Sequence, residues 1–116
     1  THKQHHPQVH VVEEREVITT RFDTFAKNKN LDLTGLNMLN LDIQGAELKA
    51  LQGIGDLLKA DHKISLIYTE VNKEHLYEGC CLVGELDEYL SQFGFKRVLT
   101  KWTEYQWGDG VWIRKV

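Results

Sequence analysis

Two carboxylate side chains stand where apolar, strand-like runs of the sequence come to an end. Asp42 lies near the end of the alternating stretch Met38–Ile43, and Glu70 lies near the end of the apolar run Ile64–Val71, with Asn72 close behind. Ligands in open α/β sheets bind at the carboxyl ends of the strands. A carboxylate at such an edge can orient a ligand or accept a proton from it. We therefore predict Asp42 and Glu70 as catalytic residues.

The polar residues around these strand ends have structural interpretations as well. Asp42 could bond the turn that follows it, although a carboxylate on an apolar strand is costly to bury unless it is paired. Strand alternation places Asn72 on the same side as Glu70, so we predict Asn72 to bind substrate. Glu47 falls in the first turn of a predicted helix, where the dipole favours acids, so capping and substrate binding both stay open. Tyr77 is predicted to line the substrate site, with a plain surface loop as the alternative.

Hydrophobic periodicity predicts two strand–helix units followed by a hairpin. The expected elements are a strand at Met38–Ile43, a helix at Ala46–Leu58, a strand at Ile64–Val71, a helix at Leu82–Phe93, and strands at Phe95–Trp102 and Val111–Val116 joined through Glu104 to Gly110. Gly53 and Gly55 weaken the first helix by about 1 kcal/mol each relative to alanine, so we expect it to bend or fray late. Gly94 is a natural cap for the second helix.

The segment before the first strong strand is less regular. Val9, Val11 and Val17–Thr20 are typical of short strands around a charged turn, and Phe22–Lys27 is typical of a brief helix with Thr20 as its N-cap.

The order of the elements limits the fold class. Two successive strand–helix units imply right-handed parallel crossovers. Two strands joined by a short connection must be antiparallel. We therefore predict an α/β sheet of parallel strands with a reversed C-terminal strand.

Length and charge exclude several classes of protein. The 116 residues suit one domain with a modest core, and 41% hydrophobic and 27% charged residues are ordinary for a soluble chain. A net charge of −3 gives no reason to expect a nucleic-acid or anionic-membrane partner. No stretch approaches the roughly 20 apolar residues that span a bilayer.

Cysteine and histidine usage argues against a disulfide framework and a metal site. Cys80 and Cys81 are adjacent and lack the spacing of a zinc site, which favours a reducing, cytoplasmic location. The N-terminal histidines lack metal-ligand partners at fixed spacing, so we expect no metal there; they are His2, His5, His6 and His10.

Several motifs in one order resemble the C-terminal half of the FkbM-type methyltransferases. They are RFDTF at Arg21–Phe25, LNLDIQGAELKALQG at Leu39–Gly53, IYTEVN, YEG, ELDEYLSQFGF and GDGVWI. The resemblance implies the Rossmann-like class I methyltransferase sheet, whose reversed last strand lies beside the fifth. It also implies S-adenosylmethionine as the cofactor, with Asp42 at the edge near the reacting methyl group. We assign Asp42, Gln44 and Gly45 to cofactor binding; Gln44 and Gly45 are expected to shape the turn.

The chain departs from the family pattern at the cofactor pocket. The family holds the methyl donor with a glycine-rich loop after its first strand and an acid that ends its second. Gly53-Ile54-Gly55 and Gly108-Asp109-Gly110 lack the strand–loop–helix context that such a loop requires. We therefore expect residues 1–116 to be the C-terminal half of the domain, with its N-terminal half as a partner.

The resemblance favours transfer of a methyl group to an oxygen of a sugar or polyketide-like small molecule, with self-association into a homo-oligomer left open. Two alternatives come from other classes. One is a non-catalytic α/β interaction module that keeps the fold. The other is a small phosphate-binding domain that uses the amides of Gly45 and Ala46, although Glu47 in the same turn would repel phosphate.

Overall fold

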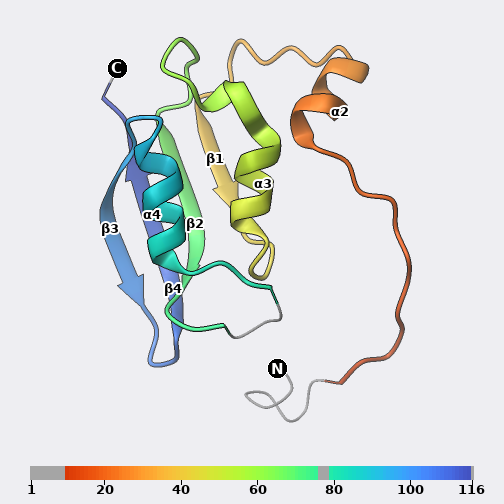
Figure 1. Cartoon of the computed structure of the whole chain (residues 1–116), viewed down its shortest axis with the longest axis vertical. Coiled ribbons are helices and arrows are strands. Elements are labelled where there is room, and N and C mark those ends of the chain that lie inside the picture. The colour runs from red at the N-terminus through yellow and green to blue at the C-terminus, as the bar shows by residue number, and fades with distance from the viewer. Residues whose placement is uncertain (1–9, 76–78, 116) are drawn as a thin grey trace.

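The computed structural model describes residues 10–75 and 79–115 and contains one four-stranded sheet with helices packed against it (Figure 1). In chain order the elements are α2 (Phe22–Asn28), β1 (Met38–Leu41), α3 (Glu47–Ile54), the 3₁₀ helix η1 (Gly55–Leu58), β2 (Leu66–Asn72), α4 (Val83–Ser91), β3 (Lys96–Trp102) and β4 (Trp107–Ile113). No described helix is long and apolar enough to cross a membrane.

The sheet is mixed, with strand order β1-β2-β4-β3. β1 and β2 are parallel, whereas β4 is antiparallel to both of its neighbours, β2 and β3. Three strands therefore run in one direction, and the last strand is inserted in reverse between the second and the third. The predicted reversal of the C-terminal strand is confirmed.

One face of the sheet carries the core. α3 and α4 lie over the same face (Figure 1), and Ile67, Val71 and Trp112 point toward them and pack with Leu51 and Leu86. Trp112 and α4 are also joined by polar contacts, because the indole Nε1 donates to Asp87 at 3.0 Å and Asp87 pairs with Arg97 at 2.9 Å.

The register places a second set of side chains on the opposite face. Met38 pairs with Leu66, and Tyr68 pairs with Val111, one residue out of phase with the core-facing positions. Met38, Tyr68 and Leu99 are all exposed there, Leu99 at 62%. The two faces of the sheet thus differ: one is buried under helices, and the other presents apolar groups to solvent.

The glycines at the end of the first long helix divide it, as expected. α3 ends at Ile54, Gly55 takes a left-handed φ of 65°, and the chain continues as η1. Gly94 has a left-handed φ of 85°, but α4 already ends at Ser91 with Gln92 as its C-cap, so Gly94 lies two residues past the cap and not directly after the helix as predicted.

The prediction of a turn at Gly108-Asp109-Gly110 is wrong, because these residues lie inside β4. A Cβ on Gly108 would collide with the carbonyl oxygen of Lys101, and one on Gly110 would lie 2.7 Å from the ring of Trp112. The glycines therefore let the strands and the indole approach closely. The connection between β3 and β4 is residues 103–106, and β4 ends at Ile113, short of the predicted Val116.

The predicted strands before α2 are absent from the described residues. Residues 10–20 contain no helix or strand and are exposed throughout, and Val9 lies outside the described part. The short helix is confirmed as α2, but its N-cap is Arg21 and not Thr20. The Arg21 guanidinium bonds Asp23 and the carbonyl oxygen of Gln52, which ties this segment to α3.

Candidate active site

The turn between β1 and α3 is built around two residues with positive φ. Gln44 has φ of 58° and Gly45 has φ of 100°, so the chain reverses sharply after Asp42. The Gly45 carbonyl accepts a hydrogen bond of 3.0 Å from the Cys81 amide, which joins this turn to the loop before α4. The expectation that Gln44 and Gly45 shape the turn is confirmed, whereas their contact with a cofactor stays a prediction.

Glu47 holds this turn from the inside. Its side chain is fully buried, and its carboxylate accepts hydrogen bonds from the amides of Ile43 at 2.8 Å and Gly45 at 3.0 Å. Acids in the first turn of a helix satisfy amides that lack intrahelical partners, and here the bonds reach back past the helix start. The geometry favours the structural interpretation, and substrate binding by Glu47 stays a prediction.

Asp42 and Glu70 meet at the carboxyl edge of the two parallel strands. Asn40 is opposite Tyr68 in the register, so Asp42 and Glu70, two residues further on, project from the same face. Glu70 is only 7% exposed, and its pKa is raised from 4.5 to about 7, most of all by this burial. Hydrogen bonding to Asp42 and the negative charges of Glu47, Asp42 and Asp109 contribute to the same shift. The two predicted catalytic acids therefore interact directly.

Asn72 occupies the next position on the same face of β2. Its side chain is fully buried, and neither Oδ1 nor Nδ2 has a hydrogen-bond partner; Oε2 of Glu70 is unpaired as well. Leaving a buried polar group unpaired costs about 1–3 kcal/mol, so such groups are rare and call for an explanation.

Asp109 and Tyr68 belong to the same cluster, although the sequence did not single them out. Asp109 is the cross-strand partner of Glu70. Burial raises the pKa of Tyr68, and the charge and hydrogen bonding of Asp109 raise it further. The signal was available in principle: once Gly108 to Gly110 is read as strand, its period of two places Asp109 on the Glu70 face.

The cluster carries uncompensated negative charge. Asp42, Glu47, Glu70 and Asp109 form no ion pair with any described basic side chain. Within residues 10–75 and 79–115, no three His, Cys, Asp or Glu side chains converge to hold a metal ion. What the arrangement offers is proton transfer and hydrogen bonding at a shared edge. Tyr77 lies outside the described residues.

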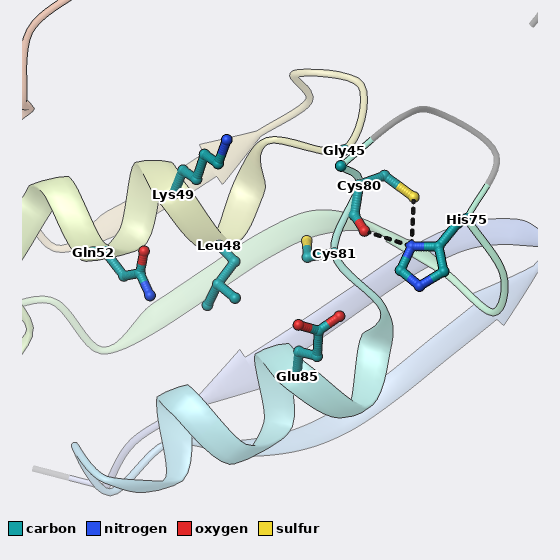
Figure 2. A pocket seen from close by; sticks show the side chains of 9 residues that line it. Gly45, Leu48, Lys49, Gln52, His75, Cys80, Cys81 and Glu85 are labelled. Carbon is teal, nitrogen blue, oxygen red and sulfur yellow. Dashed lines mark hydrogen bonds between the residues drawn. The ribbon is translucent and has the colours of Figure 1, made fainter. Parts of the chain in front are cut away.

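A cavity of 340 Å³ lies on the other side of the Gly45 turn, between α3 and the loop before α4 (Figure 2). His75 Nδ1 lies 2.9 Å from the Cys80 carbonyl oxygen and 3.9 Å from Cys80 Sγ. Both cysteines are free and buried, and burial raises the pKa of the Cys81 thiol. Because the carbonyl accepts from Nδ1–H, that nitrogen is not free to take the thiol proton, which disfavours a cysteine nucleophile.

A larger apolar groove of 950 Å³ runs along the outer edge of β1. Leu39, Leu41 and Ile43 line it together with Phe22 and residues of α3. The only strand paired with β1 in the described part of the chain is β2, so the other edge of β1 offers free backbone groups to this groove.

Comparison with known families agrees with the resemblance noted from the motifs. The family described as the methyltransferase FkbM domain matches residues 1–97, which include Asp42, Glu47, Glu70 and Asn72 but not β4. Neither the curated proteins nor the solved structures contain a match. The chain belongs to the FkbM methyltransferase domain family.

Proposed function

We propose that this chain contributes to an S-adenosylmethionine-dependent methyltransferase that methylates a hydroxyl of a sugar or other small molecule. The observation that carries the proposal is the Asp42–Glu70 pair at the carboxyl edge of parallel strands, in a chain of the FkbM methyltransferase family. The Rossmann-like class I architecture is part of the same proposal, supported by the parallel pair and the reversed strand inserted beside β2.

The residues present fit the positively charged end of the cofactor. The acid cluster has no basic partner among the described side chains, and Gln44 and Gly45 place a backbone turn next to Asp42. S-adenosylmethionine, when bound, supplies a methyl group on a cationic sulfonium. Asp42, Gln44 and Gly45 would hold that end, whereas no glycine-rich strand–loop–helix motif for the adenosine occurs in the described residues.

Asp42 and Glu70 have different roles in this proposal. Asp42 is exposed and can accept the proton of an acceptor hydroxyl. Glu70 lies below it, and its protonated form donates a hydrogen bond to Asp42 and orients that carboxylate. Alignment of the hydroxyl contributes further, because a fixed approach replaces a random encounter.

The unpaired edge of β1 is the argument that a further segment joins this sheet. We propose that the N-terminal half of the same domain pairs with β1 and covers the apolar groove of Leu39, Leu41 and Ile43. Parallel sheets bury both faces, which also accounts for the exposed apolar side chains opposite α3 and α4. Two free cysteines favour a reducing, cytoplasmic location.

Methyl transfer by the full-length protein tests this function. With radiolabelled S-adenosylmethionine and a panel of hydroxylated small molecules, Asp42→Asn should lower kcat about 10²- to 10⁴-fold, the range for loss of a general base. Asp56→Asn is the matched control, because Asp56 is an exposed acid paired only with Lys59.

Binding of S-adenosylhomocysteine, measured by calorimetry, separates chemistry from cofactor binding. Glu70→Gln should retain this binding and lose transfer. Unchanged transfer in both Asp42→Asn and Glu70→Gln would instead favour the non-catalytic interaction module.

A further inference from the structure

The unpaired groups beside Glu70 have no structural explanation within the fold. Asn72 is fully buried with both of its side-chain polar atoms unpaired, and Oε2 of Glu70 is unpaired beside it. The two residues project from one face of β2, and the cross-strand partner of Glu70, Asp109, projects from the same face of β4. The edge thus contains a donor and acceptors that find no partner in residues 10–75 and 79–115.

We propose that this cluster binds an uncharged acceptor through two neighbouring hydroxyls, held by the Asn72 carboxamide and the Glu70 carboxyl, and that it rejects phosphorylated or carboxylated acceptors. The inference rests on the proposed methyltransferase function and names the class of its acceptor.

The chemistry of Asn72 matches a pair of hydroxyls. A carboxamide offers two donors on Nδ2 and an acceptor on Oδ1. One hydroxyl can donate to Oδ1 while its neighbour accepts from Nδ2, and Oε2 of Glu70 can accept from either. A site that buries polar groups for a ligand discriminates strongly against analogues that leave those groups unpaired.

The charge around the cluster selects against anions. Asp42, Glu47 and Asp109 all act on Glu70 as negative charges. No described lysine or arginine forms an ion pair with them. Lys101 is the cross-strand neighbour of Asp109 on β3 and forms no ion pair with it. A phosphate or carboxylate would therefore approach several like charges and a single nearby lysine, whereas a neutral hydroxyl meets only acceptors and donors.

Access to the cluster is from the solvent side of Asp42 and Tyr68. Both residues are exposed, and Glu70 beneath them retains a small exposed area. Asn72 lies one strand repeat beyond Glu70 on the same face. Asn72 itself is fully buried, so a second hydroxyl of a ligand at Glu70 reaches its carboxamide only when the side chains that cover Asn72 move aside.

Nuclear magnetic resonance of the side-chain amide of Asn72 in the full chain tests the proposal directly. The probes are the methyl glycosides of glucose, galactose and mannose, the matching 6-phosphates, and tetrahydropyran-2-methanol, which has a single hydroxyl. We expect the neutral glycosides to shift the Asn72 resonance. The phosphates and the single hydroxyl should bind at least tenfold more weakly. Equal or tighter binding of the phosphates, or no shift with any neutral glycoside, would overturn the proposal.

Two variants separate a ligand role from a packing role. Asn72→Leu removes the unpaired amide, so it should raise the melting temperature and weaken glycoside binding at least tenfold; Asn40→Leu, at an exposed position of the same face, should leave binding unchanged. If the leucine variant does not fold, Asn72→Asp keeps the size and removes the donor, with the same expected loss. Unchanged binding in the folded variant refutes the assignment of Asn72.

Failure of the function and failure of this inference give different results. Glycoside binding without any binding of S-adenosylhomocysteine would remove the methyltransferase proposal and keep the polyol site. Methyl transfer to phosphorylated acceptors at rates equal to the neutral ones would keep the function and remove the selectivity.

Discussion

Replacement of Glu70 by glutamine should make the protein more stable at alkaline pH and leave it nearly unchanged at acid pH. Burial first, and then the hydrogen bond to Asp42 and the neighbouring negative charges, raise the pKa of Glu70 from 4.5 to about 7 in the folded chain. Between about pH 4.5 and 7 the folded state therefore binds more protons than the unfolded state. Stability must then fall as pH rises through this window, because a deprotonated Glu70 is buried among other acids.

The size of the effect follows from the separation of the two pKa values. At about 1.4 kcal/mol for each pKa unit, the full linkage is roughly 3 kcal/mol. Asp42 is exposed, so water screens part of the repulsion, and we expect about 1–2 kcal/mol to remain. Glutamine has the same shape without the charge, so the free energy of unfolding of the variant should not fall as pH rises through this window.

Urea denaturation at a series of pH values measures the free energy of unfolding of the wild type and of Glu70→Gln. The free energy of unfolding of Glu70→Gln minus that of the wild type should be near zero at about pH 4.5, rise between about pH 4.5 and 7, and level off above that. In an Asp42→Asn background the rise should be smaller and should level off at a lower pH, because that change removes one of the charges that raise the folded-state pKa of Glu70. A difference that does not depend on pH would refute the assignment of a buried, proton-holding Glu70.

Two further predictions concern the fold that positions the site. Arg114→Met should destabilise the chain by about 2–4 kcal/mol in urea denaturation, because it removes the donor of buried hydrogen bonds to the carbonyls of Leu58 and Ile64. It also removes part-buried hydrogen bonds to the carbonyls of His62 and Phe93. Lys115→Met, at the exposed next position, is the control. Gly108→Ala should destabilise the β3–β4 pair, because its Cβ would lie 2.8 Å from the Cα of Trp102. Gly84→Ala has nothing within 4 Å and should stabilise α4 by about 0.5–1 kcal/mol; an equal loss in both alanine variants would contradict the close-approach argument.

The sequence predicted those parts of the fold that depend on local periodicity. β1, β2 and α4 lie within two residues of the expected bounds, because each alternates or repeats apolar residues over its length. The same logic placed Asp42 and Glu70 at one edge, since two parallel strands must end on the same side.

The prediction failed where glycine is used for close approach and not for a turn. Gly108 and Gly110 follow a pattern typical of a hairpin connection, yet they lie in β4 because neighbouring backbone and the ring of Trp112 occupy the space of a Cβ. That contact joins distant residues and leaves no local signal. As a result Asp109 was assigned to a turn, although it faces Glu70.

The burial of individual side chains is the second property that could not be predicted from the sequence. It distinguishes the two catalytic candidates, Asp42 and Glu70, from each other. Asp42 and Glu70 have equivalent side-chain chemistry, and a sequence offers no reason to prefer one as the base. The structure exposes Asp42 and buries Glu70, and burial keeps the proton on Glu70 up to about pH 7. Two neighbouring acids in different environments separate into a proton holder and a proton acceptor. In the proposed reaction the exposed Asp42 would be the base that meets the acceptor hydroxyl, and Glu70 would position it. Above about pH 7 the loss of the Glu70 proton should disrupt the pair, so the rate of transfer should fall on the alkaline side.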